Sequence, residues 1–263
     1  RLSMARETKI NIKFILFLTF LGFIGLVVSI PFQMTTLMNS ELVSEVDVPI
    51  EIGMIITTIS QTITLFVLVF IGERCMHRTG LGAPIIHAWL DKKDIPALQK
   101  KWVLAAAIVG FVGALIVILL DHFLFMPNVG VSEEVPIAPW WQGLLAMFYG
   151  GFTEELMVRF FAMTFIVWLL AIITRKQRET IPAAYFYIGI VLATLLFGIG
   201  HLPTVAQIYG ELSALLVVRT VLLNGLLGLW FGYLYWKKGL EYAFIAHMSA
   251  DVMIHVIFNP LFG

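Results

Sequence analysis

Long apolar runs alternate with short polar segments along the whole chain. A membrane-spanning α-helix needs ~20 apolar residues, and the runs of that kind lie near residues 14–38, 52–72, 102–125, 140–173, 182–201, 212–236 and 239–258. None shows the alternation over ~10 residues that is typical of a membrane β-barrel strand. The pattern predicts an all-α, polytopic transmembrane bundle, and the first run is too long for a cleavable signal peptide.

The fourth run is too long for one straight crossing, since at the helical rise it would extend roughly 50 Å. Gly150 and Gly151 lie within it and offer a place for a break. Trp140 and Trp141 at its start are residues that favour the membrane interface. We expect seven spans, or eight if the segment before the two glycines makes its own crossing.

Basic residues gather in every second loop, and acidic residues fill the loops between. Because cytoplasmic loops carry the excess of lysine and arginine, the N-terminus is predicted to be cytoplasmic. The basic residues are Arg6, Lys9, Lys13, Arg74, Arg78, Lys92, Lys93, Lys100, Lys101, Arg175, Lys176, Arg178, Lys237 and Lys238. The acidic residues are Glu41, Glu45, Asp47, Glu51, Glu133 and Glu134.

The segment 81–99 is predicted to form short amphipathic helices on the cytoplasmic surface, because Pro84 and Asp94 occupy helix-start positions.

The composition of the whole chain is that of a membrane protein. Hydrophobic residues make up 60% of 263 residues and charged residues 13%, with a mean hydropathy of +0.93. A soluble domain is about half apolar and about a quarter charged.

The net charge is zero, from 17 basic and 17 acidic residues, which argues against a nucleic-acid partner. The single Cys75 excludes an internal disulfide and a multi-cysteine metal site, and we expect a buried free thiol.

Three short polar patches interrupt the apolar runs. A charge at the centre of a bilayer costs roughly 2.5–3.5 kcal/mol on insertion scales, so such groups usually face a cavity and carry function. Because the patches lie on three predicted helices, we expect them to form one hydrolytic centre inside the membrane. They are Glu154-Glu155-x-x-x-Arg159, Phe197-x-x-x-His201 and His247-x-x-x-Asp251.

In the first patch, Glu155 and Arg159 are four residues apart, so they share a helix face and can pair. Glu154 points about 100° away from its neighbour. This arrangement suits one structural carboxylate beside one free carboxylate that acts on water. The alternative is an interfacial ion pair with a spare glutamate among the headgroups.

His201 is expected to close the fifth span, one turn after Phe197, where a lone histidine would usually be a helix cap. His247 and Asp251 are four apart on the seventh span and can face one cavity. Asp251 would fix the imidazole tautomer or, if protonated, donate to an oxyanion. His255 continues the same face but nears the membrane edge, so we rank it below the others.

Arg219 and Asn224 are further polar groups in the sixth span, and Arg219 is expected to snorkel or to pair with Glu211. The sequence has no His-Glu-x-x-His zinc-protease motif, no Gly-x-Ser-x-Gly elbow and no Gly-x-Gly-Asp of an aspartyl intramembrane protease. Ser249 lies beside His247 on a different face, so a serine–histidine dyad is not expected.

The three patches, in this order on successive helices, resemble the motifs of the CPBP intramembrane proteases. This family comprises type II CAAX prenyl endopeptidases and bacteriocin self-immunity (Abi) proteins. The likeness covers about residues 140–260 and includes the Gly-Tyr-Leu-Tyr stretch at 232–235. It implies a catalytic helical core at 131–263, preceded at 1–130 by N-terminal transmembrane helices with the cytoplasmic amphipathic segment.

The resemblance also implies roles for the site residues. Glu154 would be the general base that activates water, and His201 would help to hold that water. His247 would stabilise the oxyanion together with the residue at 251. The expected catalytic residues are Glu154, Glu155, His201, His247 and Asp251, with Arg159 and Phe197 in support.

Many family members have asparagine where this chain has Asp251. An ionised aspartate would repel an oxyanion, so this residue must be protonated, bonded to His247, or serve as a ligand or orienting group.

The spacing of the motifs leaves the use of a metal open. Two histidines and two or three carboxylates can satisfy zinc, and the expected ligands would then be Glu154, His201 and His247. Resemblance to the better understood members favours a glutamate-dependent mechanism without a cofactor.

We therefore expect a multi-pass intramembrane endopeptidase of the cell membrane, with membrane lipid and a peptide or lipidated protein as its partners. The alternatives are a non-catalytic family member that binds a membrane partner, and a transporter whose buried charges carry protons. Prenylated C-termini, peptide pheromones and bacteriocin leaders all remain open as substrates. With a cytoplasmic N-terminus, His201 would lie ~28 Å from the cytoplasmic end of its span, in the outer half of the membrane.

Overall fold

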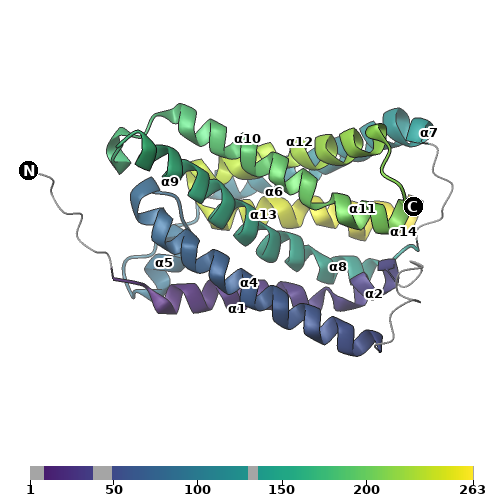
Figure 1. Ribbon diagram of the computed structural model, residues 1–263, viewed down its shortest axis with the longest axis horizontal. Coiled ribbons are helices and arrows are strands. Elements are labelled where there is room, and N and C mark those ends of the chain that lie inside the picture. Colours follow the sequence, from purple (N-terminus) through teal and green to yellow (C-terminus); the bar gives the residue numbers. More distant parts are fainter. Residues whose placement is uncertain (1–8, 38–48, 130–135, 263) are drawn as a thin grey trace, which may run out of the picture.

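The computed structural model describes residues 9–37, 49–129 and 136–262, which form helices and connecting loops with no strand among them (Figure 1). The α-helices are α1 (Ile12–Val28), α2 (Ile30–Leu37), α4 (Ile50–Thr79), α5 (Pro84–Leu90), α6 (Lys100–Leu120), α7 (Met126–Val129), α8 (Trp140–Phe148), α9 (Thr164–Ile173), α10 (Ala183–Gly200), α11 (Leu202–Tyr209), α12 (Ala214–Lys238), α13 (Leu240–Asp251) and α14 (Asn259–Phe262). Wider π-helical turns occur in η1 (Asp121–Phe125), η2 (Tyr149–Glu154), η3 (Leu156–Met163) and η5 (Val252–Phe258), and η4 (Arg178–Thr180) is a 3₁₀ turn.

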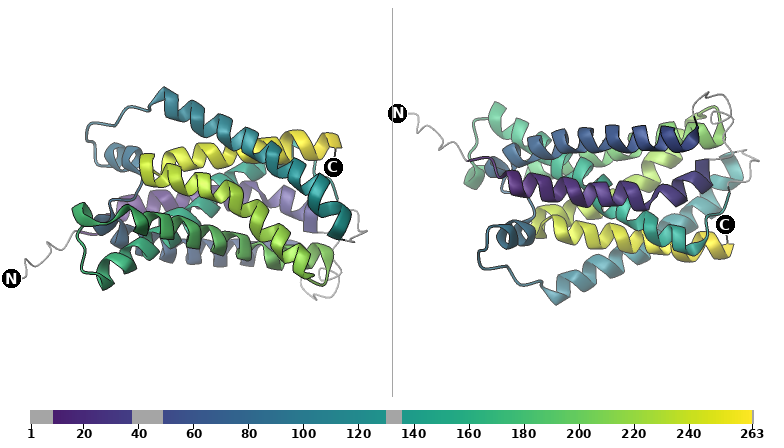
Figure 2. Two further views of the ribbon diagram at one scale, coloured as in Figure 1. Left: turned by 90° about the horizontal axis from the view of Figure 1, so that it is seen from above. Right: turned by 90° about the horizontal axis from the view of Figure 1, so that it is seen from below.

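The long helices lie side by side along one axis, as both views of Figure 2 show. Within the described ranges, 6 helices are long and apolar enough to cross a membrane. A seventh span results if α1 and α2, which are bent by 43° at Ser29, are counted together. The predicted all-α polytopic bundle is confirmed, and the protein is a multi-pass membrane protein.

The fourth span differs from the prediction, because α8, η2, η3 and α9 form one continuous helix of 34 residues, Trp140–Ile173. The expected break at Gly150 and Gly151 is wrong, and the segment before them makes no separate crossing. A Cβ atom at Gly150 would overlap Asp251, and one at Gly151 would overlap Met248. The glycines therefore allow close contact with α13, and the wider turns of η2 keep the helix continuous.

The fifth span is also longer than its apolar run indicates, because α10 and α11 together form the span Ala183–Tyr209. The prediction that His201 closes this span is therefore wrong. Pro203 stands in the first turn of α11, where a missing backbone N–H leaves no hydrogen bond unmade. His201 thus lies inside the span, with helix on both sides of it.

The predicted cytoplasmic amphipathic segment forms one helix, α5, where two were expected. Pro84 begins α5 as predicted, but no helix begins at Asp94. The reason is local, since Ile95 precedes Pro96 and a residue before proline disfavours the helical conformation. The Glu241 carboxylate on α13 fixes the start of α5 by accepting two hydrogen bonds from its backbone, at 2.8 and 2.9 Å.

The partner of Arg219 on α12 also differs from the prediction. Its guanidinium donates from Nε and Nη2 to the two carboxylate oxygens of Asp121, at 2.6 and 2.5 Å. The predicted partner Glu211 is therefore wrong, and the side chain does not snorkel. Pairing within the span relieves the cost of placing either charge in lipid.

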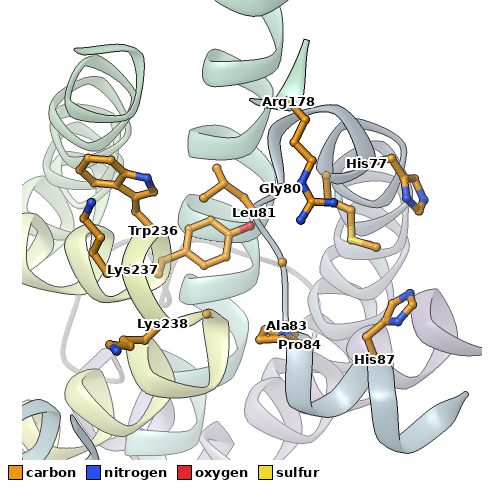
Figure 3. A pocket seen from close by; sticks show the side chains of 14 residues that line it. His77, Gly80, Leu81, Ala83, Pro84, His87, Arg178, Trp236, Lys237 and Lys238 are labelled. Carbon is orange, nitrogen blue, oxygen red and sulfur yellow. The ribbon is translucent and has the colours of Figure 1, made fainter. Parts of the chain in front are cut away.

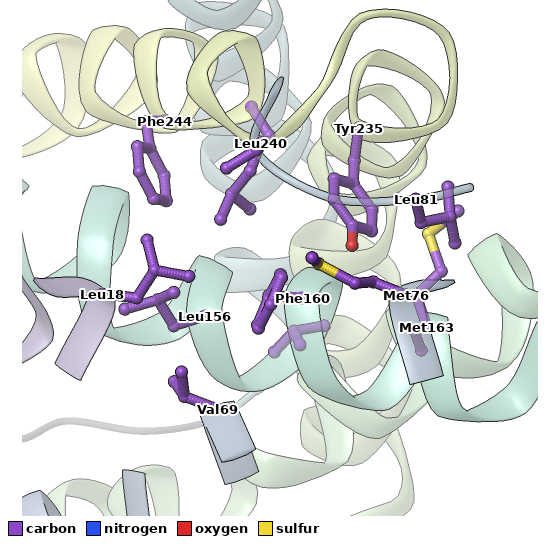
Figure 4. Close-up of a cluster of buried hydrophobic side chains, with 14 of the residues drawn as sticks. Leu18, Val69, Met76, Leu81, Leu156, Phe160, Met163, Tyr235, Leu240 and Phe244 are labelled. Carbon is purple, nitrogen blue, oxygen red and sulfur yellow. The ribbon is translucent and has the colours of Figure 1, made fainter. Parts of the chain in front are cut away.

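The helix that carries the two glutamates is central to the bundle. Its η2 segment packs against α1 and α13, and its η3 segment packs against α4 and α10. Large apolar side chains fill the space around η3 and are fully buried (Figure 4). A second apolar cluster holds α6, α12 and α13 together. The buried free thiol expected at position 75 is confirmed.

Candidate active site

The structure brings the three polar patches together at one place. Glu154 lies on the central helix, His201 at the junction of α10 and α11, and His247 on α13. The two carboxylate oxygens of Glu154 lie 3.7 Å from His201 Nε2 and 3.5 Å from His247 Nε2. Asp251 lies one turn after His247, with Oδ1 3.8 Å from its Nε2.

The two adjacent glutamates have different surroundings. Glu155 is completely buried, and its Oε1 lies 2.7 Å from His247 Nδ1 and 3.0 Å from Arg159 Nη1. Glu154 is 15% exposed, and the distances to its two histidines exceed those of direct hydrogen bonds. One carboxylate is therefore held by its partners, while the other is left free for chemistry.

Arg159 is 1% exposed and holds Glu155 in place from below. Its Nη2 donates to the Gly228 carbonyl at 2.9 Å, and its guanidinium lies over the rings of Phe197 and Phe231 at 5.2 and 5.4 Å. A Cβ atom at Gly228 would lie 2.9 Å from this Nη2, so glycine leaves the room that the guanidinium needs.

His247 is fixed on two sides. The ring of Phe231 stacks against its imidazole at a centroid distance of 4.6 Å, with 21° between the planes. Nδ1 donates to the Glu155 carboxylate, since a carboxylate accepts only. The neutral ring therefore carries its proton on Nδ1 and directs Nε2 toward Glu154 and Asp251.

His201 is oriented by its own helix. Its Nδ1 donates to the Phe197 carbonyl at 2.8 Å, and the Phe197 ring meets the imidazole edge-on at 4.6 Å. In the neutral ring Nε2 is then an acceptor that faces Glu154. The spacing of Phe197 and His201 thus sets the tautomer.

Glu154, Phe197, His201, His247 and Asp251 line a cavity of about 590 Å³, whereas Glu155 and Arg159 are not among its lining residues. His255, which we had ranked lower, also lines it, as do Asn224 and Tyr149. Sequence reasoning missed the contribution of α2, namely Gln33 and Thr36, together with Ser29 before it. A signal was present, because positions 29, 33 and 36 repeat at helical spacing within an apolar run.

Residues 136–253 match the family model of the type II CAAX prenyl endopeptidase Rce1-like proteins. This part of the chain is therefore similar to that family. The Rce1-like segment contains all three polar patches, so the resemblance read from the motifs is confirmed, and the family is one of CAAX-type intramembrane proteases. Comparison of the chain with curated proteins and with solved structures gave no match.

The expected zinc ligands Glu154, His201 and His247 all line this cavity. Among residues 9–37, 49–129 and 136–262, no group of three or more histidine, cysteine, aspartate or glutamate side chains is arranged to hold a metal ion.

A second hollow, of about 400 Å³, lies at the end of the bundle where α12 meets the loop before α5 (Figure 3). Its charged lining side chains are basic: Arg178, Lys237 and Lys238. Neither a carboxylate nor a residue of the three patches lines it, so the Rce1-like motifs point to the first cavity alone.

Proposed function

We propose that the protein is an intramembrane endopeptidase that hydrolyses peptide bonds of membrane-associated peptides or proteins with a water molecule activated by Glu154. The observation that carries this proposal is the contrast between the two glutamates. Glu155 is held by Arg159 and His247, whereas Glu154 faces a cavity between two imidazoles. A free carboxylate beside oriented acceptors is suited to general-base catalysis.

The hydrogen-bonding roles of the site define how water is held. One hydrogen of the water is donated to the Glu154 carboxylate and the other to His201 Nε2, whose lone pair is available because Nδ1 donates to Phe197. The water then directs an oxygen lone pair at the peptide carbonyl. As its oxygen attacks the carbonyl carbon, Glu154 takes the proton, and it returns this proton to the leaving amine as the C–N bond breaks.

His247 and Asp251 stabilise the negative charge on the carbonyl oxygen. In its protonated form, His247 keeps one N–H on Glu155 and directs the other, on Nε2, into the cavity. Asp251 lies 3.8 Å from Nε2, so it is not hydrogen-bonded to that ring. As a protonated carboxyl it donates to the oxyanion in the way that asparagine does in the members that this chain resembles.

The glutamate mechanism needs no metal, and we propose that none takes part. This proposal is supported by the roles of the polar groups of the site. Each ring nitrogen and each carboxylate already binds water, fixes a tautomer or stabilises charge in the mechanism above. Zinc on Glu154, His201 and His247 is the alternative.

The decisive experiment is cleavage of a peptide library by purified protein in lipid, compared with the Glu154→Gln variant. Glutamine preserves shape and removes the base, so turnover should fall by about 10²–10⁴-fold while the protein stays folded. Glu51→Gln is the matched control, since Glu51 is exposed in the first turn of α4, away from the site. Equal cleavage by Glu154→Gln and wild type would refute the mechanism.

A further inference from the structure

The two ends of the bundle differ in charge. The described lysines and arginines lie at the end where α1 begins, except for Arg159 and Arg219, which are paired with Glu155 and Asp121. The residues at that end are Lys9, Lys13, Arg74, Arg78, Lys92, Lys93, Lys100, Lys101, Arg175, Lys176, Arg178, Lys237 and Lys238. Since cytoplasmic loops carry the excess of basic residues, this end is predicted to face the cytoplasm.

The cavity extends toward the opposite end. Its lining continues from the site along α2, α11 and η5. In Figure 1, α2 and α11 lie at the end of the bundle away from the start of α1. Along the fifth span, His201 is about 27 Å from Ala183 at the basic end and about 12 Å from Tyr209 at the other end. The exposed lining residue Thr204 lies on this shorter side.

The path from the site to the basic end is filled. Leu156, Phe160, Met163 and Leu240 are completely buried there, and Tyr235 is 1% exposed. Figure 4 shows these side chains filling the space between the helices. Such an interior is packed as densely as an organic crystal, so it leaves no passage for a peptide. A substrate that enters from the aqueous phase must therefore approach the site from the other end.

The walls of the cavity also limit the charge of its ligand. Its ionisable lining groups within the described residues are Glu154, Asp251, three histidines and Tyr149, and neither lysine nor arginine is among them. The remaining polar lining side chains, among them Gln33, Thr36 and Asn224, are uncharged. A negatively charged group would find carboxylates and no permanent cation, whereas a neutral or basic peptide is matched to this surface.

From these observations we propose that the cavity admits a neutral or basic peptide segment from the non-cytoplasmic side of the membrane. This inference rests on the proposed endopeptidase function and specifies its substrate class. The free carboxylate of a cytoplasmic, prenylated C-terminus would have to cross the packed interior and would find no cation in the cavity. Neutral or basic segments of secreted or membrane-anchored peptides, cleaved on the non-cytoplasmic side, meet both conditions.

The direction of opening is tested by labelling single introduced cysteines on intact cells with a membrane-impermeant maleimide. Thr204→Cys and Glu211→Cys lie near the proposed opening, and Lys93→Cys and Lys237→Cys lie at the basic end. Wild type is the background control, because its one cysteine is buried.

We expect the first pair to react from outside and the second pair only after permeabilisation. The reverse pattern, or equal labelling of both pairs, would overturn the inference. Two positions at each end protect the test against one variant that does not fold.

A second measurement connects the opening to catalysis. Labelled Thr204→Cys should lose cleavage because the adduct fills the cavity, whereas labelled Glu211→Cys, whose side chain is not in the lining, should keep it. Peptides with basic flanks, added at the face labelled by Thr204→Cys, should be cleaved about tenfold faster than acidic ones, the effect of one interaction between charges ~10 Å apart. Faster cleavage of acidic peptides, or cleavage only from the basic face, would contradict the inference.

The two proposals fail in different ways. Cleavage that survives Glu154→Gln removes the proposed mechanism, while the labelling pattern still decides where the cavity opens. Glu154-dependent cleavage with the reversed labelling pattern removes only the inference about substrate access.

Discussion

Glu154 and Glu155 are neighbours of the same residue type, yet the fold gives them different chemistry. Their side chains point about 100° apart on the helix, so one enters the packed interior and the other the cavity. Glu155 meets Arg159 one turn along the same helix and His247 across the interface with α13. The fixed carboxylate of Glu155 orients the imidazole of His247. This orientation directs His247 Nε2 toward the free carboxylate of Glu154.

The first prediction at the residue scale concerns Arg159. Arg159→Ala leaves Glu155 as a buried carboxylate without its cation, which costs about 3–5 kcal/mol. We expect a much lower yield of monodisperse protein in size-exclusion chromatography. Arg178→Ala is the control, since this arginine is exposed in the 3₁₀ turn η4. An unchanged yield of Arg159→Ala would show that Glu155 does not depend on it.

The second prediction concerns Asp251. Asp251→Asn should keep or raise kcat, because an amide donates to an oxyanion without first being protonated. Asp251→Ala should lower kcat more than it changes KM, since the interaction forms in the transition state. Steady-state kinetics on the same peptide measure both effects. Loss of activity together with loss of bound zinc in Asp251→Asn would instead assign this residue to a metal site.

At the scale of elements, the central helix combines length with close contact. Its η2 segment has no side chain at Gly150 or Gly151, and α13 approaches there so closely that the His247 side chain reaches Glu154. Single wider turns of this type are frequent at functional sites of helices. The site therefore lies at the part of the helix where Gly150 and Gly151 leave the backbone without side chains.

The third prediction tests this contact. Gly150→Ala places a methyl group against Asp251 and close to His247, and overpacking of this kind costs about 1–3 kcal/mol. Thermal stability should fall, and cleavage should fall more steeply because the site is displaced. Gly53→Ala is the matched control, since a Cβ atom there meets open space and alanine favours the helix by about 0.8–1 kcal/mol. Equal behaviour of the two variants would contradict the close approach.

At the scale of the whole molecule, residues from three spans form one candidate site. Buried apolar side chains, among them Leu156, Phe160 and Met163, fill the space between this site and the basic end of the bundle. The N-terminal spans are part of this arrangement. Helix α1 packs against η2, and α2 supplies polar residues to the cavity wall. The Rce1-like segment at 136–253 thus depends on its neighbours for the cavity.

The fourth prediction concerns metal in the complete protein. A catalytic zinc takes three protein ligands and a water, and the described side chains offer no such group. We expect purified protein to contain substoichiometric zinc by elemental analysis and to keep its activity in strong chelators. About one zinc per chain, with activity lost on stripping and restored by zinc, would contradict the glutamate mechanism.

The sequence alone predicted the helical bundle and the residues of the candidate site. Apolar runs of membrane length predict spans because lipid accepts only helices whose backbone is satisfied. The pairing of Glu155 with Arg159 follows from a spacing of four, since such residues share a helix face. The buried charges of the patches predict a common cavity, because isolated charges in lipid are costly.

Only the tertiary structure decided what lies across from each residue. Asp121 as the partner of Arg219, α2 as a cavity wall and the continuous helix through Gly150 all depend on packing between segments far apart in the chain. The spacing of residues in the sequence defines which side chains are neighbours on one helix. Contacts between helices depend instead on where glycines of one helix pack against large side chains of another. The same packing fills one end of the bundle and leaves the cavity to extend toward the other, so the direction of access is a property of the fold.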